Sequence, residues 1–283
     1  PLANRRDKYT QAIWGIRDFE RRFQRSPEGM WLPETAVDLE SLDILAELGI
    51  RFTILSPYQA TRWRPLGEEA WQDAGGGHID PTRPYLQNLP SGRTISVFFY
   101  DGPISQALAF EKLLAKGENL VSRLAGAFSD VRDWPQLVHI ATDGESYGHH
   151  HAHGDMALAY ALQVIEEQQV ARLTNYGQYL ESHPPEQEVE IAENTAWSCT
   201  HGVERWRADC GCNSGRAGWN QAWRGPLRES LDWLRDEMAP RYEKTAGELL
   251  RDPWAARDQY VDVILDRSAE NVERFLARHA TRE

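Results

Sequence analysis

Residues 137–150 have the sequence Leu-Val-His-Ile-Ala-Thr-Asp-Gly-Glu-Ser-Tyr-Gly-His-His. The first five residues form an apolar run that is too short for a helix and predicts a buried strand. Asp143, Glu145 and two histidines follow directly, among glycines that free the backbone to present them. Titratable groups gathered at a strand end predict an active site on an α/β fold. The alternative is a solvated acidic loop ahead of a helix at 155–169.

A second acid stands at the end of another short apolar run, Met30-Trp31-Leu32-Pro33-Glu34. Glutamate is rarely buried without a partner, and the preceding proline restricts the backbone, so we expect Glu34 to be held at the end of a buried strand. The alternative is a helix start, because 34–38 has the composition of an N-terminal cap. Two acids at two strand ends would suit the catalytic pair of a glycosidase.

The rest of the chain divides into two parts. Strand–helix–strand units favour a parallel sheet in the first part, where the interval 56–92 is expected to be an irregular loop. The expected helices are 11–25, 39–48, 105–114, 119–128, 155–169 and 178–182, and the expected strands are 50–55, 95–100, 137–141 and 173–176. Later helices are expected at 226–237, 241–251, 254–265 and 269–279. We expect two domains, a partial (β/α) barrel catalytic domain at 1–191 and a Trp- and Cys-bearing loop with helices at 192–283.

The composition is that of an ordinary soluble protein of 283 residues. Lys and Arg total 31 against 43 Asp and Glu, and the net charge of -12 argues against nucleic acid or an anionic membrane as a partner. There is no apolar run long enough to cross a membrane. Three cysteines provide no disulfide framework, so a reducing cytoplasm is the expected location.

The two acidic motifs together resemble glycoside hydrolase family 57. Trp-Leu-Pro-Glu at 31–34, followed about a hundred residues later by Asp-x-Glu-x-x-Gly-His at 143–149, is similar to the third and fourth signature motifs of that family. The resemblance implies a distorted, seven-stranded type of (β/α) barrel and a retaining enzyme that acts on oligo- or polysaccharide α-glucans without a cofactor. It places Glu34 as the nucleophile and Asp143 as the general acid/base. It also extends to family-57-related bacterial proteins with an additional C-terminal domain of unknown function.

One departure concerns the beginning of the chain. The family's first motif, a His-Gln-Pro-like stretch, has no counterpart here, and the second motif would precede Pro1. We therefore expect the chain to be the middle and later part of a longer protein, with a truncated barrel. A signal peptide in the preceding part would change the cytoplasmic assignment.

Aromatic and polar residues near the two motifs and in the later loop are expected to contact sugar. Indole faces stack on the apolar faces of sugars, and imidazole and carboxylate groups bond hydroxyls. The expected substrate contacts are Trp31, Glu145, His149, His150, Trp197, Asp209 and Trp219. For the tryptophans, packing in a core is the competing role.

Four potential metal ligands lie in the later loop: Cys199, His201, Cys210 and Cys212. They match a Cys₃His zinc site in ligand type, but their spacing is tighter than in the usual zinc knuckles. We therefore expect buried free thiols, with a structural zinc or a disulfide as alternatives. His149 and His153 could share an ion only if they lay on one helix.

Two other functions stay open at this point. One is a metal-dependent polysaccharide deacetylase, or an α-mannosidase-like enzyme, with Asp143, His149 and His153 as ligands. The other is a non-catalytic relative that binds glycan through tryptophans. Hydrolysis and transfer to another sugar share their first half-reaction, so the residues do not separate them, and they do not specify the oligomeric state.

Overall fold

The computed structural model describes residues 1–212 and 215–281 and divides the chain into two compact units. The first unit combines residues 1–28, 36–50 and 194–283, and the second combines residues 29–35 and 51–193. Each unit is described by itself. The division into domains at residue 191 stays a prediction, since the units follow packing rather than chain order.

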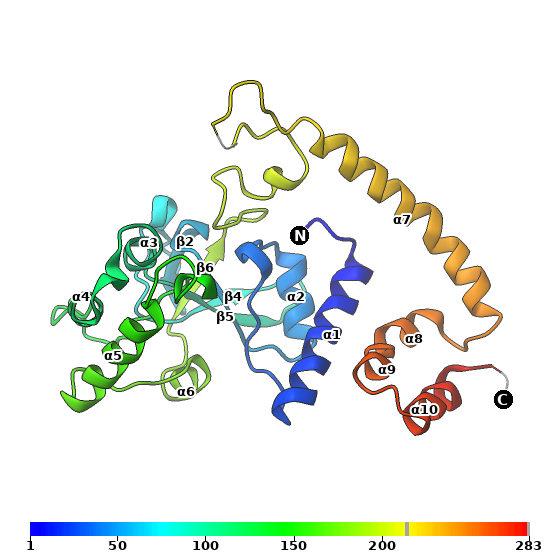
Figure 1. The fold of residues 1–283 in the computed structure, drawn as a ribbon, viewed down its shortest axis with the longest axis horizontal. Coiled ribbons are helices and arrows are strands. Elements are labelled where there is room, and N and C mark those ends of the chain that lie inside the picture. Colours follow the sequence, from blue (N-terminus) through cyan, green and yellow to red (C-terminus); the bar gives the residue numbers. More distant parts are fainter. Residues whose placement is uncertain (213–214, 282–283) are drawn as a thin grey trace. The chain divides into compact units, whose positions relative to one another are not determined.

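A six-stranded mixed sheet forms the base of the second unit (Figure 1). Its strands are β1 (Phe52–Leu55), β2 (Ala60–Pro65), β3 (Gln72–Asp73), β4 (Tyr85–Asn88), β5 (Thr94–Phe99) and β6 (Gln187–Ile191). They lie in the order β1-β5-β4-β6-β2-β3. β1 pairs with β5 and β4 with β6 in parallel, and the other neighbours are antiparallel. The described sheet is open, and the predicted α/β class is confirmed.

Helices α3 (Gly102–Phe110), α4 (Gly117–Ala125), α5 (Gly154–Glu167) and α6 (Tyr176–Ser182) belong to the same unit. α4 and α5 lie side by side, as Figure 1 shows. A Cβ on Gly117 would lie 2.3 Å from the Tyr160 ring, so a side chain at this position would hold the two helices apart. Leu108, Leu120 and Ala161 form part of the core beneath them.

Several predictions about strands and loops in this unit are wrong. The interval 56–92 contains three strands, β2 to β4, and β6 was not expected at all. β2 and β6 lack an apolar run, and the ion pairs Arg62–Glu190 and Arg64–Glu188 join them across the ladder. The expected strand at 173–176 is absent, because Asn175 caps α6 with its side chain.

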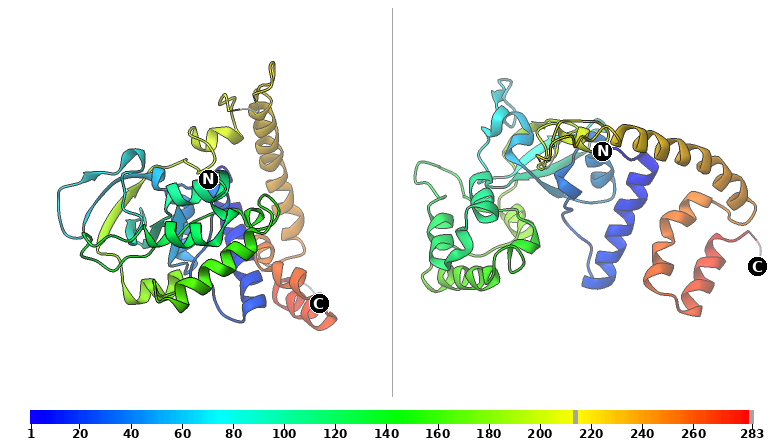
Figure 2. Two further views of the ribbon diagram at one scale, coloured as in Figure 1. Left: turned by 60° about the vertical axis from the view of Figure 1, so that its left-hand side comes forward. Right: turned by 45° about the horizontal axis from the view of Figure 1, so that its top comes forward.

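The first unit is helical. It contains α1 (Arg5–Phe23), α2 (Leu39–Glu47), α7 (Arg224–Gly247), α8 (Pro253–Gln259), α9 (Val261–Leu265) and α10 (Ala269–His279). α1 packs against α2, α8 and α9, and Figure 2 shows α1 beside the latter two. Arg257 of α8 joins this contact by an ion pair of 2.7 Å with Asp7 of α1.

In the first unit, two expectations about which residues form one helix are wrong. The expected pair at 226–237 and 241–251 is one helix, α7, which continues through Pro240. The expected helix at 254–265 is divided at Tyr260 into α8 and α9. Among the described residues, no helix is both long and apolar enough to span a membrane.

Candidate active site

The segment that leads to Glu34 is anchored to β1. Gly29 forms an isolated parallel bridge with Phe52, the Met30 amide donates to the Phe52 carbonyl at 3.1 Å, and the Thr53 hydroxyl donates to the Met30 carbonyl at 2.8 Å. The predicted buried strand is therefore wrong: pairing stops at Met30, and Trp31 is 41% exposed. The anchor nevertheless runs parallel to β1.

Gly29 is required by the close approach of this segment to β1. A Cβ built on Gly29 would lie 2.2 Å from Cε2 of Phe52. Such a distance is far inside van der Waals contact, so any side chain here would displace the Phe52 ring or the backbone. The glycine thus fixes the path of the chain just before Glu34.

Glu34 itself lies in a strained turn. Pro33–Thr35 is a short 3₁₀ turn in which Glu34 has φ 58° and ψ 19° and Thr35 has φ 50°. Left-handed backbone is unfavourable for any residue with a Cβ and most unfavourable for a β-branched one. Each such residue costs of order 1–3 kcal/mol, and such strain concentrates at functional sites. The alternative of a helix start is also wrong, because α2 begins later, after its cap at Asp38.

A buried glutamine holds this turn in place. Gln59, which is 1% exposed, donates from Nε2 to the Thr35 carbonyl at 2.8 Å and accepts from the Ser56 amide at 2.9 Å. Thr35 is fully buried, whereas Glu34 is half-buried. The turn therefore has one fixed backbone geometry and directs the Glu34 side chain from a rigid base.

The segment that leads to Asp143 is extended but is not a strand. The Leu137 amide donates to the Thr82 carbonyl at 2.8 Å, and the Asp101 amide donates to the His139 carbonyl at 2.9 Å. The expected strand at 137–141 is wrong in this sense, because the segment bonds to Asp101, two residues after β5, and to Thr82 in the loop before β4. The apolar residues of this segment indicate that it is buried, but they do not indicate a ladder of strand hydrogen bonds.

His139 anchors this segment from within. Its side chain is 9% exposed, with Nδ1 2.9 Å from the Tyr176 hydroxyl and Nε2 3.0 Å from the Pro81 carbonyl. Burial lowers the pKa of His139 to about 4, so the ring is neutral near pH 7. A carbonyl only accepts, so Nε2 carries the hydrogen and Nδ1 accepts from Tyr176.

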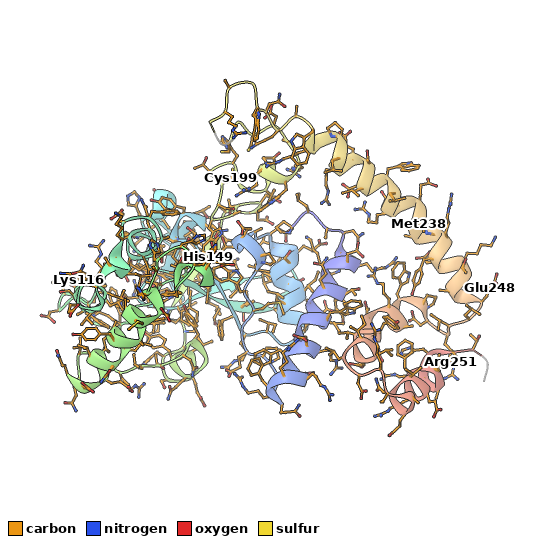
Figure 3. The ribbon with its side chains drawn as sticks, in the orientation of Figure 1. Lys116, His149, Cys199, Met238, Glu248 and Arg251 are labelled. Carbon is orange, nitrogen blue, oxygen red and sulfur yellow. The ribbon has the colours of Figure 1, made fainter. Side chains whose placement is uncertain are left out.

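Asp143 and Glu145 are both exposed on the loop that follows. Gly144–Ser146 is a 3₁₀ turn, and the amides of His149 and His150 both donate to the Glu145 carbonyl, at 3.1 and 2.8 Å. The two imidazoles are exposed, with ring centroids 5.0 Å apart, and Figure 3 labels His149 on this loop. The loop thus gathers two carboxylates and two imidazoles.

The Glu34 and Asp143 segments lie at the same end of the sheet, where β1 and β5 have their carboxyl ends. The Met30 segment runs parallel to β1, β1 runs parallel to β5, and Asp101, just beyond β5, bonds to His139. Glu34 and Asp143 both come a few residues after the paired residues Met30 and His139. Both acids therefore lie beyond the carboxyl ends of β1 and β5. The Met30 segment, β1, β5 and the His139 segment lie next to one another in this order. Three spacings of about 4.8 Å therefore put roughly 14 Å between the backbones of the Met30 and His139 segments, and the side chains and the curvature of the sheet have to reduce this distance between the two carboxyl groups.

The remaining predicted contacts lie in the first unit. Trp197 is half-buried and Trp219 is 58% exposed. Asp209 accepts a hydrogen bond from the Gln221 amide at 3.0 Å through Oδ1, so part of its bonding capacity serves its own loop. Their contact with sugar stays a prediction.

The predicted alternative of a metal at Asp143, His149 and His153 is not formed. Among residues 1–212 and 215–281, the group that brings three or more potential ligand atoms together is Cys199, His201, Cys210 and Cys212. His153 instead adopts left-handed backbone at the start of α5. The arrangement of the described residues therefore gives no support to the deacetylase and α-mannosidase-like hypotheses.

Two positioning residues were not foreseen. The sequence offered a sign for His139, because this residue interrupts an otherwise apolar run and a buried imidazole needs hydrogen-bond partners. The sequence offered no such sign for Gln59, because only the fold brings this residue beside Thr35.

Comparison with protein families gives two matches. The model described as glycosyl hydrolase family 57 matches residues 2–192, and a domain of unknown function (DUF3536) matches residues 219–283. The comparison with curated proteins found no match.

Several solved structures share the fold. An exo-type maltose-forming amylase from Pyrococcus sp. ST04 aligns with a TM-score of 0.71 and 16% identity over 97% of this chain and 49% of its own. A branching enzyme from Thermococcus kodakaraensis aligns with a TM-score of 0.59 and 16% identity over 97% of this chain and 61% of its own. A 4-α-glucanotransferase from Thermococcus litoralis aligns with a TM-score of 0.55 and 18% identity over 86% of this chain and 33% of its own. The chain thus spans less than two thirds of each of these proteins.

Proposed function

Because this chain belongs to glycoside hydrolase family 57, we propose that it supplies the catalytic pair of a retaining glycosidase or transglycosidase that acts on α-glucans. The observation that carries the proposal is the rigid, strained turn at Glu34, at the same end of the sheet as the Asp143 loop. The three structural relatives named above are a maltose-forming amylase, a branching enzyme and a glucanotransferase, which supports α-glucan as the substrate class.

In the first half-reaction, the Glu34 carboxylate attacks the anomeric carbon while protonated Asp143 donates its proton to the leaving oxygen. The glycosidic bond breaks and an ester between the sugar and Glu34 forms. In the second half-reaction, Asp143 as carboxylate removes a proton from the incoming hydroxyl, which displaces Glu34 from the sugar. Two displacements at the anomeric carbon retain its configuration.

The two acids differ in ways that suit these roles. A nucleophile must approach the anomeric carbon along a fixed line, and the left-handed turn bonded to Gln59 limits the freedom of Glu34. An acid/base catalyst must reach the leaving oxygen in the first half-reaction and the incoming hydroxyl in the second, and Asp143 lies on an exposed loop. Retention calls for carboxyl groups about 5–5.5 Å apart in the productive complex.

The identity of the acceptor decides between hydrolysis and transfer. Water gives a shorter glucan, and a sugar hydroxyl gives a new glycosidic bond. Incubation of the complete protein with a single maltooligosaccharide distinguishes them: hydrolysis yields only shorter products, whereas transfer also yields longer ones.

The catalytic assignment is tested with two variants of the complete protein and one control. Glu34→Gln should abolish turnover of every substrate, because the ester cannot form. Asp143→Asn should retain more activity on an aryl glycoside whose leaving group hardly needs a proton, and added azide should restore its second step. The exposed Asp133→Asn is the control and should match the wild type.

Full activity in Glu34→Gln would reject the mechanism. Equal loss on natural and activated substrates in Asp143→Asn, without azide rescue, would remove Asp143 from the acid/base role. Glycan binding by the wild type without any turnover would favour the non-catalytic hypothesis instead.

A further inference from the structure

The loop between β6 and α7 brings three sulfurs and one imidazole nitrogen together, in the region of Cys199 that Figure 3 labels. The Sγ atoms of Cys199 and Cys212 are 3.8 Å apart, and His201 Nδ1 lies 3.7 Å from the former and 3.5 Å from the latter. With Cys210 included, all four ligand atoms lie within 4.8 Å of one another. The cluster is confined to the first unit.

These separations are those of the corners of a tetrahedron around a zinc ion. Zinc–sulfur bonds of about 2.3 Å in a tetrahedral site place two sulfurs about 3.8 Å apart. With a zinc–nitrogen bond of about 2.0 Å, the sulfur–nitrogen separation is about 3.5 Å. The distances among Cys199, His201 and Cys212 agree with both values, and Cys210 lies within 4.8 Å of the other three ligand atoms.

The local fold explains how such close spacing in sequence forms a site. The four ligands come as two pairs, each with one intervening residue, and a bridge between Ala196 and Cys199 orients the first pair. Gly211, with φ 83°, reverses the backbone between Cys210 and Cys212 so that both thiols face one point. The intervening residues 202–209 then fold back and bring the two pairs together.

Gly202 anchors the return of the chain. It has φ 61°, and a Cβ built on it would lie 2.1 Å from the Asn194 carbonyl oxygen. The next residue, Val203, is fully buried against Ala196 and Trp206 and donates its amide to the same carbonyl at 2.9 Å. The position of the His201 ligand is therefore set by packing that does not depend on the metal.

Hydrogen bonds to the sulfurs surround the cluster. The His201 amide donates to Cys199 Sγ at 3.4 Å, and the Cys210 thiol donates to Oε1 of buried Gln221 at 3.3 Å. A metal-bound thiolate has no hydrogen to donate, so the Gln221 side-chain amide would turn over in the zinc-bound state and direct its N–H group at the sulfur. Asp209 accepts from the Gln221 backbone amide and so holds this residue in place. Such outer contacts are usual around metal-bound thiolates.

We propose that Cys199, His201, Cys210 and Cys212 bind one zinc ion as a structural site. All four positions are filled by protein ligands, so no position is open for substrate or water. The expectation of buried free thiols is wrong for two of the three cysteines, since Cys210 is half-buried and Cys212 is exposed. The proposal does not depend on the proposed glycosidase activity.

The role of the ion is to hold a loop that has a small apolar core. The cluster of Ala36, Ala196 and Val203 lies beneath the first ligand pair, whereas Cys212 is exposed. Metal binding supplies the stabilisation that apolar burial provides elsewhere. Removal of the ion should therefore expose the loop to proteolysis without unfolding the sheet of the second unit.

The direct test is metal analysis of the wild-type protein, purified without added metal, together with X-ray absorption at the zinc edge. We expect about one zinc per chain, with three sulfur ligands near 2.3 Å and one nitrogen near 2.0 Å. Absence of bound zinc after zinc reconstitution, or a ligand shell of only nitrogen and oxygen, would overturn the proposal. So would a disulfide among these cysteines under reducing conditions.

Variants assign the ligands. Cys212→Ser, at an exposed position, should weaken zinc binding in competition with a chelator by more than the 10- to 100-fold that outer contacts contribute. Gln221→Ala should fall within that smaller range, and Ser198→Ala in the same loop should bind as the wild type does. Unchanged affinity in Cys212→Ser would reject the site. Loss of zinc together with unchanged circular dichroism separates ligand removal from misfolding.

Discussion

Replacing His139 with glutamine should flatten the dependence of stability on pH. In the folded protein His139 is buried between Tyr176 and Pro81, and its pKa is about 4. In the unfolded chain the pKa of histidine is about 6.5. As the pH falls, the unfolded state therefore takes up the proton first, so the stability from this residue is complete above about pH 6.5 and is lost toward pH 4.

The size of the effect follows from the difference between the two pKa values. About 2.5 units correspond to about 3 kcal/mol in total, and roughly 2 kcal/mol of this is lost between about pH 8 and pH 5. Urea unfolding at several pH values, followed by circular dichroism, measures the free energy of unfolding of the wild type and of His139→Gln. The difference between the two proteins should shrink by about 2 kcal/mol over this interval.

The comparison isolates His139 from the other histidines, which are present in both proteins. Parallel pH profiles in the wild type and His139→Gln would refute the assignment of a buried neutral imidazole. The Asp143 segment would then need another anchor.

Three further changes test the Glu34 turn. Gly29→Ala should lower the free energy of unfolding by about 1–3 kcal/mol in urea titrations, because its Cβ meets Phe52, and an unchanged value would contradict the close approach. Gln59→Ala should cost about 1–3 kcal/mol for the buried groups left unpaired and should lower kcat as the Thr35 turn loosens; equal stability and activity would show that the turn holds itself. Glu34→Gly should raise the melting temperature while abolishing turnover, since glycine relieves left-handed strain, and a lower melting temperature would argue against stored strain.

The sequence predicted those elements whose pattern is local. α10 begins and ends where the apolar spacing places it, at 269 and 279, with Ser268 as its cap. β2 and β6 escaped prediction because charged pairs such as Arg62–Glu190, not apolar alternation, join them. Ion pairs between distant strands have no signature in either strand alone.

The candidate site could be located but not built from the sequence. The two acids were found because each follows a short apolar run, although neither run is a strand in the structure. A short apolar run indicates a buried segment, and a buried segment without strand hydrogen bonds has the same sequence pattern as a buried strand. The cysteine cluster could not be predicted from its spacing for a related reason: distance along the chain says little about distance in space when Gly202 and Gly211 reverse the backbone.

The central claim, that Glu34 is the nucleophile of a retaining enzyme, is tested most directly by trapping the glycosyl-enzyme. A fluorosugar donor whose ester with the enzyme hydrolyses slowly is incubated with the complete protein, which is then digested and sequenced by mass spectrometry. We predict one added sugar per chain, attached to Glu34 in the peptide that contains Trp31 and Pro33. A sugar on a different carboxylate, or turnover of the donor through an inverted product with no adduct, would contradict the account.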